Sequence, residues 1–120
     1  MTSGPDPVGT LDVALPHAEK LLVSQPDLAA EQAREILGAV PNHPAATLLL
    51  AMARRRSNDV AEALRILEPL AASQPRWPAA QRELGLALGD AGRGEEAVEA
   101  LRAAVRLQPA MADAWRALGD

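Results

Sequence analysis

The residues best suited to phosphate binding form the glycine-rich run GDAGRG at positions 89–94. A helix is expected directly after this run, and the amide groups at a helix N-terminus attract anions. The glycines follow the order G-x-x-G-x-G, however, and no strand pattern precedes them, so the run matches neither the dinucleotide-binding nor the P-loop fingerprint. We therefore interpret Gly92 and Gly94 as the turn between two helices.

Side chains that could act in catalysis or bind a metal are scattered along the chain. Glu95, Glu96 and Glu99 could form an acid pair, but glutamates in the first turn of a helix also complement its dipole. His17 and His43 are the only histidines, and a zinc site needs about four converging ligands. The serines have no neighbouring His–Asp pair, and the chain has no cysteine. The sequence therefore predicts no enzymatic activity, no metal and no cofactor.

The run Arg54-Arg55-Arg56 has two interpretations. It falls at the predicted end of a helix, where the helix dipole favours cations. It could also contact an anionic peptide together with Arg82, which follows further along the chain. Both interpretations stay open from the sequence.

Helices are the elements expected to carry these residues. The chain is rich in Ala, Leu, Arg and Glu, which favour helices, and it shows no period-two alternation of β-branched residues. Hydrophobic residues make up 48% of the chain but aromatic residues only 2%, which suits thin layers of closely packed helices. The Ala, Arg and Pro content is also typical of proteins from GC-rich bacterial genomes. We predict helices at 10–24, 27–39, 44–57, 60–73, 78–91, 94–107 and 112–119.

A period of 34 residues organises these helices. The residues at this spacing are Ala29, Ala63 and Ala97; Pro41, Pro75 and Pro109; Leu50, Leu84 and Leu118; and Ala51, Gly85 and Gly119. The small residues allow two helices to cross closely, and the prolines end a helix because they cannot continue it. A period of this length indicates stacked helical hairpins.

The spacing resembles the tetratricopeptide repeat family, whose pattern is W-x2-L-G-x2-Y, then A-x3-F, then P. Trp115, Leu118 and Gly119 match its opening, and the repeat at 78–111 matches with Leu88 and Leu101 in place of aromatic residues. The resemblance implies an all-α, right-handed superhelical solenoid of antiparallel helix pairs with about seven helices. It also implies a non-catalytic protein–protein interaction scaffold.

The predicted domain organisation follows from the repeats. The Gly- and Pro-rich start is predicted to be a disordered leader. Pro16 interrupts the first apolar stripe, so the first helix is expected to begin near Leu15 or to kink there. The chain looks cut from a longer array, because its last repeat is partial and carries Trp115. We expect the chain to self-associate through its C-terminal helix or to fray there. The predicted boundaries are a leader at 1–9 and a repeat domain at 10–120, with repeats at 10–43, 44–77, 78–111 and a partial repeat at 112–120.

The resemblance places partner binding on the concave groove formed by the first helix of each repeat. Some family members hold a peptide carboxylate there with Lys and Asn, but the matching positions of this chain carry other residues, among them Leu49 and Glu83. The groove is therefore expected to bind an apolar protein or peptide segment between basic flanks. The residues predicted to line it are Leu48, Met52, Arg55, Arg56, Arg82 and Leu86.

The formal net charge of −4 argues against a nucleic acid or an anionic membrane as partner. The start of the chain lacks the features of a signal peptide, and its longest apolar run is too short to span a bilayer, so a cytoplasmic location is predicted. Residues 30–51 and 66–88 suggest an alternative function. Their sequences have a general similarity to the N-terminal repeat region of bacterial proteins that join such repeats to a sulfotransferase domain. The chain would then be a regulatory or dimerisation segment of a larger enzyme.

Overall fold

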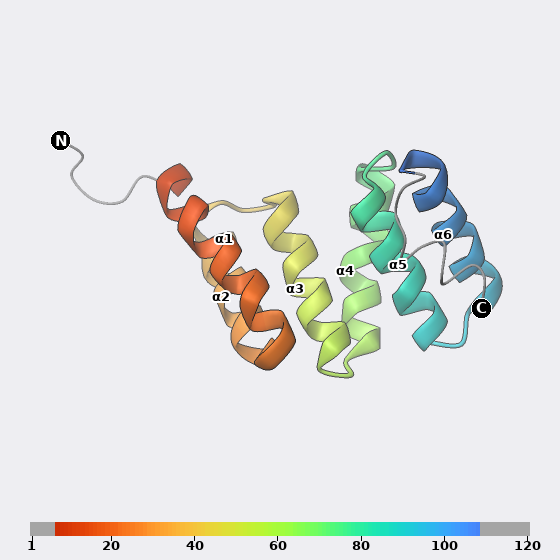
Figure 1. Cartoon of the computed structure of the whole chain (residues 1–120), viewed down its shortest axis with the longest axis horizontal. Coiled ribbons are helices and arrows are strands. Elements are labelled where there is room, and N and C mark those ends of the chain that lie inside the picture. Colours follow the sequence, from red (N-terminus) through yellow and green to blue (C-terminus); the bar gives the residue numbers. More distant parts are fainter. Residues whose placement is uncertain (1–6, 109–120) are drawn as a thin grey trace. The chain divides into compact units, whose positions relative to one another are not determined.

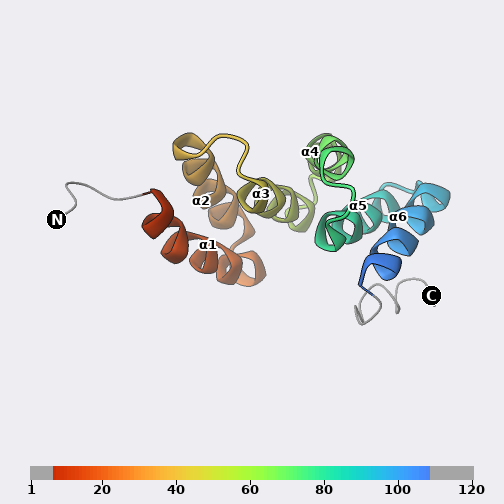
Figure 2. The same cartoon turned by 90° about the horizontal axis from the view of Figure 1, so that it is seen from above.

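Six α-helices form the part of the chain that the structure, a computed structural model, describes: the backbone of residues 7–108 and the side chains of residues 14–108 (Figures 1 and 2). These residues contain no strand. The ends of these helices agree closely with those predicted, and the seventh predicted helix, at 112–119, lies outside the described residues. The helices are α1 (Pro7–Ser24), α2 (Pro26–Ala39), α3 (Pro44–Arg56), α4 (Val60–Ser73), α5 (Pro78–Asp90) and α6 (Gly94–Leu107).

The first helix departs from the sequence prediction at its start. It begins at Pro7, so residues 7–9, assigned to the leader, are helical. It also continues through Pro16, so a start near Leu15 is wrong. A proline inside a helix removes one backbone hydrogen bond. Burial of neighbouring residues offsets that loss, because Ala18, two residues later, is fully buried in the core of α1, α2 and α3.

Two inter-helix turns share one geometry at equivalent positions of the repeat. Asn58 and Gly92 lie 34 residues apart and have φ values of 68° and 81°, in the left-handed region. In the first turn the Asp59 amide donates to the Arg54 carbonyl at 2.8 Å, and the corresponding bond one repeat later is 2.9 Å long. This bond over five residues closes a helix end in a Schellman motif. Gly92 therefore makes the turn as predicted, whereas Gly94 is already the first residue of α6.

Helices α1, α2 and α3 pack together in a first unit, which ends at Asp59. Alanine dominates the facing surfaces, which lets the helices approach closely. The Ser57 hydroxyl donates to Asp27 Oδ1 at 2.9 Å and so joins the end of α3 to the start of α2. The core residues of this unit are Ala18, Leu22, Ala29, Ala30, Ala33, Leu49 and Ala53.

The second unit begins at Val60, and in it α5 packs against both α4 and α6 (Figure 1). The closest approach is between α5 and α6. A Cβ atom built on Gly85 would lie 2.7 Å from Leu101 Cγ and 3.2 Å from the Ala97 carbonyl oxygen. The predicted crossing of two helices at a small residue is therefore confirmed for Gly85 and Ala97. No helix between residues 7 and 108 is long and apolar enough to cross a membrane.

Candidate functional site

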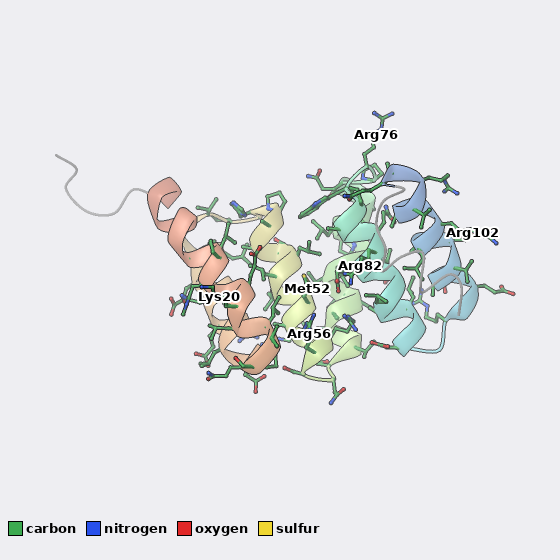
Figure 3. The ribbon with its side chains drawn as sticks, viewed as in Figure 1. Lys20, Met52, Arg56, Arg76, Arg82 and Arg102 are labelled. Atoms are coloured by element: carbon green, nitrogen blue, oxygen red, sulfur yellow. The ribbon has the colours of Figure 1, made fainter. Side chains whose placement is uncertain are left out.

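Four of the predicted groove residues lie on α3, in the first unit. Leu48 is buried, with 7% of its surface exposed. Met52 is half-buried and packs against the core of α1, α2 and α3. Arg55 is half-buried and Arg56 is exposed in the last turn of the helix, where cations complement the dipole; Figure 3 labels Met52 and Arg56. Of the four, Met52, Arg55 and Arg56 are at least partly exposed to solvent.

The other two predicted residues, Arg82 and Leu86, lie on α5 in the second unit, and both are half-buried. Arg82 is labelled in Figure 3, and its Nη1 donates a hydrogen bond to Glu83 Oε2. The structure therefore describes two surfaces on first helices, one in each unit, with an apolar and a basic side chain on each. A single groove that contains all six residues remains a prediction.

Glu83 is a buried carboxylate that sequence reasoning did not identify. Only 1% of its surface is exposed, and a buried charge is costly unless it is paired. The repeat could have revealed it, because Leu49 lies 34 residues earlier and is also buried, at 4% exposure. The ion pair with Glu83 holds the Arg82 guanidinium close to α5, which leaves that cation less available to a ligand than the sequence suggested.

The glycine-rich run and the glutamates after it have structural roles. Arg93, in the turn before α6, donates from Nε and Nη2 to the Glu96 carboxylate, both at 2.8 Å, and from Nη2 to Glu68 of α4 at 3.0 Å. The hydrogen bond from Arg93 lowers the pKa of Glu96, and those to Glu96 and Glu68 raise the pKa of Arg93. All three side chains are exposed, so these ion pairs contribute little to stability.

The histidines do not come together. His43 caps α3, and its Nδ1 accepts a hydrogen bond from the Ala46 amide at 3.2 Å. His17 lies on α1 beside Glu31 and Glu35 of α2, at the edge of a surface hollow. Within the described part of the chain, no three His, Asp or Glu side chains are arranged to hold a metal ion.

The repeat geometry agrees with a sequence comparison. A profile of the tetratricopeptide repeat matches residues 21–80, 48–112 and 82–120. The chain belongs to the tetratricopeptide repeat family. The predicted all-α repeat fold is thereby confirmed, whereas the comparisons give no support to an origin in a sulfotransferase protein. A search of curated proteins returns no match.

Solved structures show the same tetratricopeptide repeat fold. The "MamA RS-1 ArsTM double mutant" and "MamA 41-end from Desulfovibrio magneticus RS-1" are each 25% identical, with TM-scores of 0.76 and 0.77, and each match covers 95% of this chain. "Crystal structure of MamA", at 19% identity and a TM-score of 0.76, matches over 91% of the chain. The chain spans 62%, 63% and 64% of these three proteins, which is under two thirds of their length.

Proposed function

We propose that this tetratricopeptide repeat chain is a non-catalytic scaffold that binds a segment of a partner protein on the exposed faces of its first helices. The observation that supports this function is the family match, which extends from residue 21 to residue 120. Stacked helical repeats present extended surfaces that such proteins use for binding. The proposed contact residues are Met52, Arg55 and Arg56 on α3 and Arg82 and Leu86 on α5. Leu48 is buried and is not proposed as a direct contact.

The chemistry of these surfaces indicates the kind of segment that would bind. Met52 and Leu86 each leave part of an apolar side chain at the surface, and methionine adapts its shape to different partners. Arg56 adds an exposed positive charge at the end of α3. We therefore expect an apolar segment that also carries an acidic residue. A cytoplasmic location belongs to the same proposal.

The test is a double substitution, Met52→Glu with Leu86→Glu, in the whole chain. The immobilised double variant should no longer retain the partners that immobilised wild-type protein retains, because two carboxylates now lie on the binding faces. Its helical circular dichroism signal should stay unchanged. Leu48 is left in place because a charge at this buried position would unfold the protein rather than test binding. The matched control is Val98→Glu, which adds a charge at an exposed apolar position of α6. Loss of the same partners from the control, or their retention by the double variant, would reject this surface.

Self-association through residues 112–119 is a separate part of the proposal and rests on sequence alone. Trp115 and Leu118 lie at the apolar positions of the repeat pattern. Exposed apolar faces favour association. Sedimentation velocity at about 100 μM, a concentration in the range where exposed apolar surface promotes association, should show dimers or larger species for the wild type. Trp115→Arg should shift the protein to monomer, and a monomeric wild type would refute the idea.

A further inference from the structure

A hollow of about 290 Å³ lies within the second unit, where α4, α5 and α6 meet. Its apolar lining residues are Leu84 and Leu88 of α5 and an alanine of α6, and Gln81 also lines it. Carboxylates stand around it: Glu68 from α4 and Glu96 and Glu99 from α6. The hollow therefore combines apolar and negatively charged side chains.

The repeat pattern explains why the hollow exists. Gln81, Leu84 and Leu88 occupy the three α5 positions where the pattern W-x2-L-G-x2-Y has Trp, Leu and Tyr. Gln81 replaces the tryptophan, and its amide nitrogen donates to the Pro75 carbonyl at 3.3 Å. Leu88 replaces the tyrosine and is almost fully buried. Two aromatic rings are missing from this side of α5, and their absence leaves space that the remaining side chains do not fill.

The charge around the hollow is not balanced. Arg93 pairs with Glu68 and Glu96, so one cation serves two carboxylates. Glu99 forms no ion pair with any residue between 14 and 108. Arg102, one turn further along α6, extends outward from that helix (Figure 3). Arg102 and Arg106 line a neighbouring hollow together with Glu99, but neither lines this one. The charged side chains that line this hollow are therefore all carboxylates.

We propose that this hollow binds an aromatic side chain of a partner polypeptide that is flanked by lysine or arginine. A cavity of about 150 Å³ accepts a benzene ring, so 290 Å³ is enough for an indole ring. The ring would replace the missing aromatic side chains over Leu84 and Leu88, and the flanking cation would pair with Glu99. Charge complementarity with the carboxylates selects a basic rather than an acidic segment.

This site is distinct from the proposed binding face of α5. At about 100° per residue along a helix, Arg82 and Leu86 point to nearly the opposite side of α5 from Leu84 and Leu88. The inference therefore does not rest on the proposed function. A failure of the Met52→Glu and Leu86→Glu test would leave it unaffected.

The test is a titration of the 120-residue chain with the blocked tripeptide acetyl-Lys-Trp-Lys-amide. Binding is measured from the changes in amide chemical shifts in ¹H–¹⁵N NMR spectra. The hollow is open and the probe is small, so we expect a dissociation constant on the order of 1 mM, with shifts concentrated at the residues that line the hollow. Acetyl-Glu-Trp-Glu-amide tests the charge and acetyl-Lys-Ala-Lys-amide tests the ring. Both should bind at least about tenfold more weakly. Equal binding of either control peptide would overturn the proposal.

Two variants place the binding in the hollow. Glu99→Gln removes the lining carboxylate that has no ion pair among residues 14–108, at constant size. It should weaken binding of the Lys-Trp-Lys peptide about two- to fivefold, the range of a surface charge pair. The matched control Glu95→Gln, an exposed residue of the same helix that does not line the hollow, should change it less than about 1.5-fold. Gln81→Trp should fill the space and abolish the shifts. Unchanged binding by Glu99→Gln or by a folded Gln81→Trp variant would refute the site. If the amide signals of the lining residues shift when the protein is diluted without peptide, the hollow binds a second copy of the chain, and the proposal is overturned.

Discussion

Replacement of Gly85 by alanine tests the closest contact in the structure. The added methyl group would lie 2.7 Å from Leu101 Cγ and 2.9 Å from Leu101 Cδ2, both well inside normal contact distance. It would also lie 3.2 Å from the backbone oxygen of Ala97, which cannot move without a shift of α6. The leucine side chain can rotate only into a region that is already packed, since Leu101 is buried.

Two opposing effects set the size of the change. Alanine in place of glycine inside a helix stabilises it by about 1 kcal/mol. Overpacking of a buried contact costs about 1–3 kcal/mol. The net loss of unfolding free energy for Gly85→Ala is therefore about 0–2 kcal/mol, and a reference variant is needed to separate the two effects.

Gly89→Ala supplies that reference. Gly89 lies one turn further along the same helix, and a Cβ atom there would meet only Ala97 Cβ at 4.0 Å, an ordinary contact. This variant should be more stable than the wild type by up to about 1 kcal/mol. Urea denaturation followed by circular dichroism at 222 nm should then separate the two variants by about 1–3 kcal/mol, the overpacking cost alone.

A double-mutant cycle identifies the residue responsible. Leu101→Ala alone should destabilise by about 2–5 kcal/mol, as other buried leucine truncations do. In that background Gly85→Ala should lose most of its penalty, because two of its three close contacts are to the leucine side chain. The reasoning fails if Gly85→Ala is as stable as Gly89→Ala, or if its penalty persists without the leucine.

Three further predictions concern other parts of the molecule. Gly92→Val should lower the unfolding free energy by about 1–2 kcal/mol in urea denaturation, because φ is +81° there, while Gly92→Asn should retain most of it. Ala63→Leu and Ala97→Leu should each cost about 1–3 kcal/mol because both alanines are buried, and melting temperatures within a degree of wild type would show that the assigned crossing positions are wrong. In Arg93→Gln the pKa of Glu96, measured by NMR titration, should rise to its ordinary value. Because that pKa is lowered in the folded protein, the ion pair stabilises the fold at pH values above the unfolded-state pKa of a glutamate. This stabilisation is lost as the pH falls through the lowered pKa. The unfolding free energy of Arg93→Gln should therefore fall less on acidification than that of the wild type.

The sequence predicted most of the described helices to within a residue or two because their ends are set locally. Pro44 and Pro78 occupy the first turns of α3 and α5, where a proline needs no amide hydrogen. Asn58 and Gly92 adopt the left-handed conformation that ends the helix before each turn. The first helix was the exception, since Pro16 suggested a break that packing of the neighbouring residues overrides.

Which side chains are available to a partner could not be read from the repeat pattern. Leu48 was expected on the surface of a groove and is buried, while Met52 on the next turn is half-exposed. Glu83, which the sequence analysis named only at a position matching the family's peptide clamp, is buried against Arg82. A position in a repeat fixes the direction in which a side chain leaves its helix, but its exposure also depends on what the neighbouring helices place over it.

By itself, the sequence determined the helices, the turns and the 34-residue register, because each of these depends on residues close together in the chain. Only the tertiary structure decided where space remains. The hollow over Leu84 and Leu88 arises because α4 and α6 stay packed against α5 although the aromatic residues of the pattern are absent. Its carboxylate lining depends on Glu68 and Glu99, which lie 31 residues apart and meet only when the helices pack.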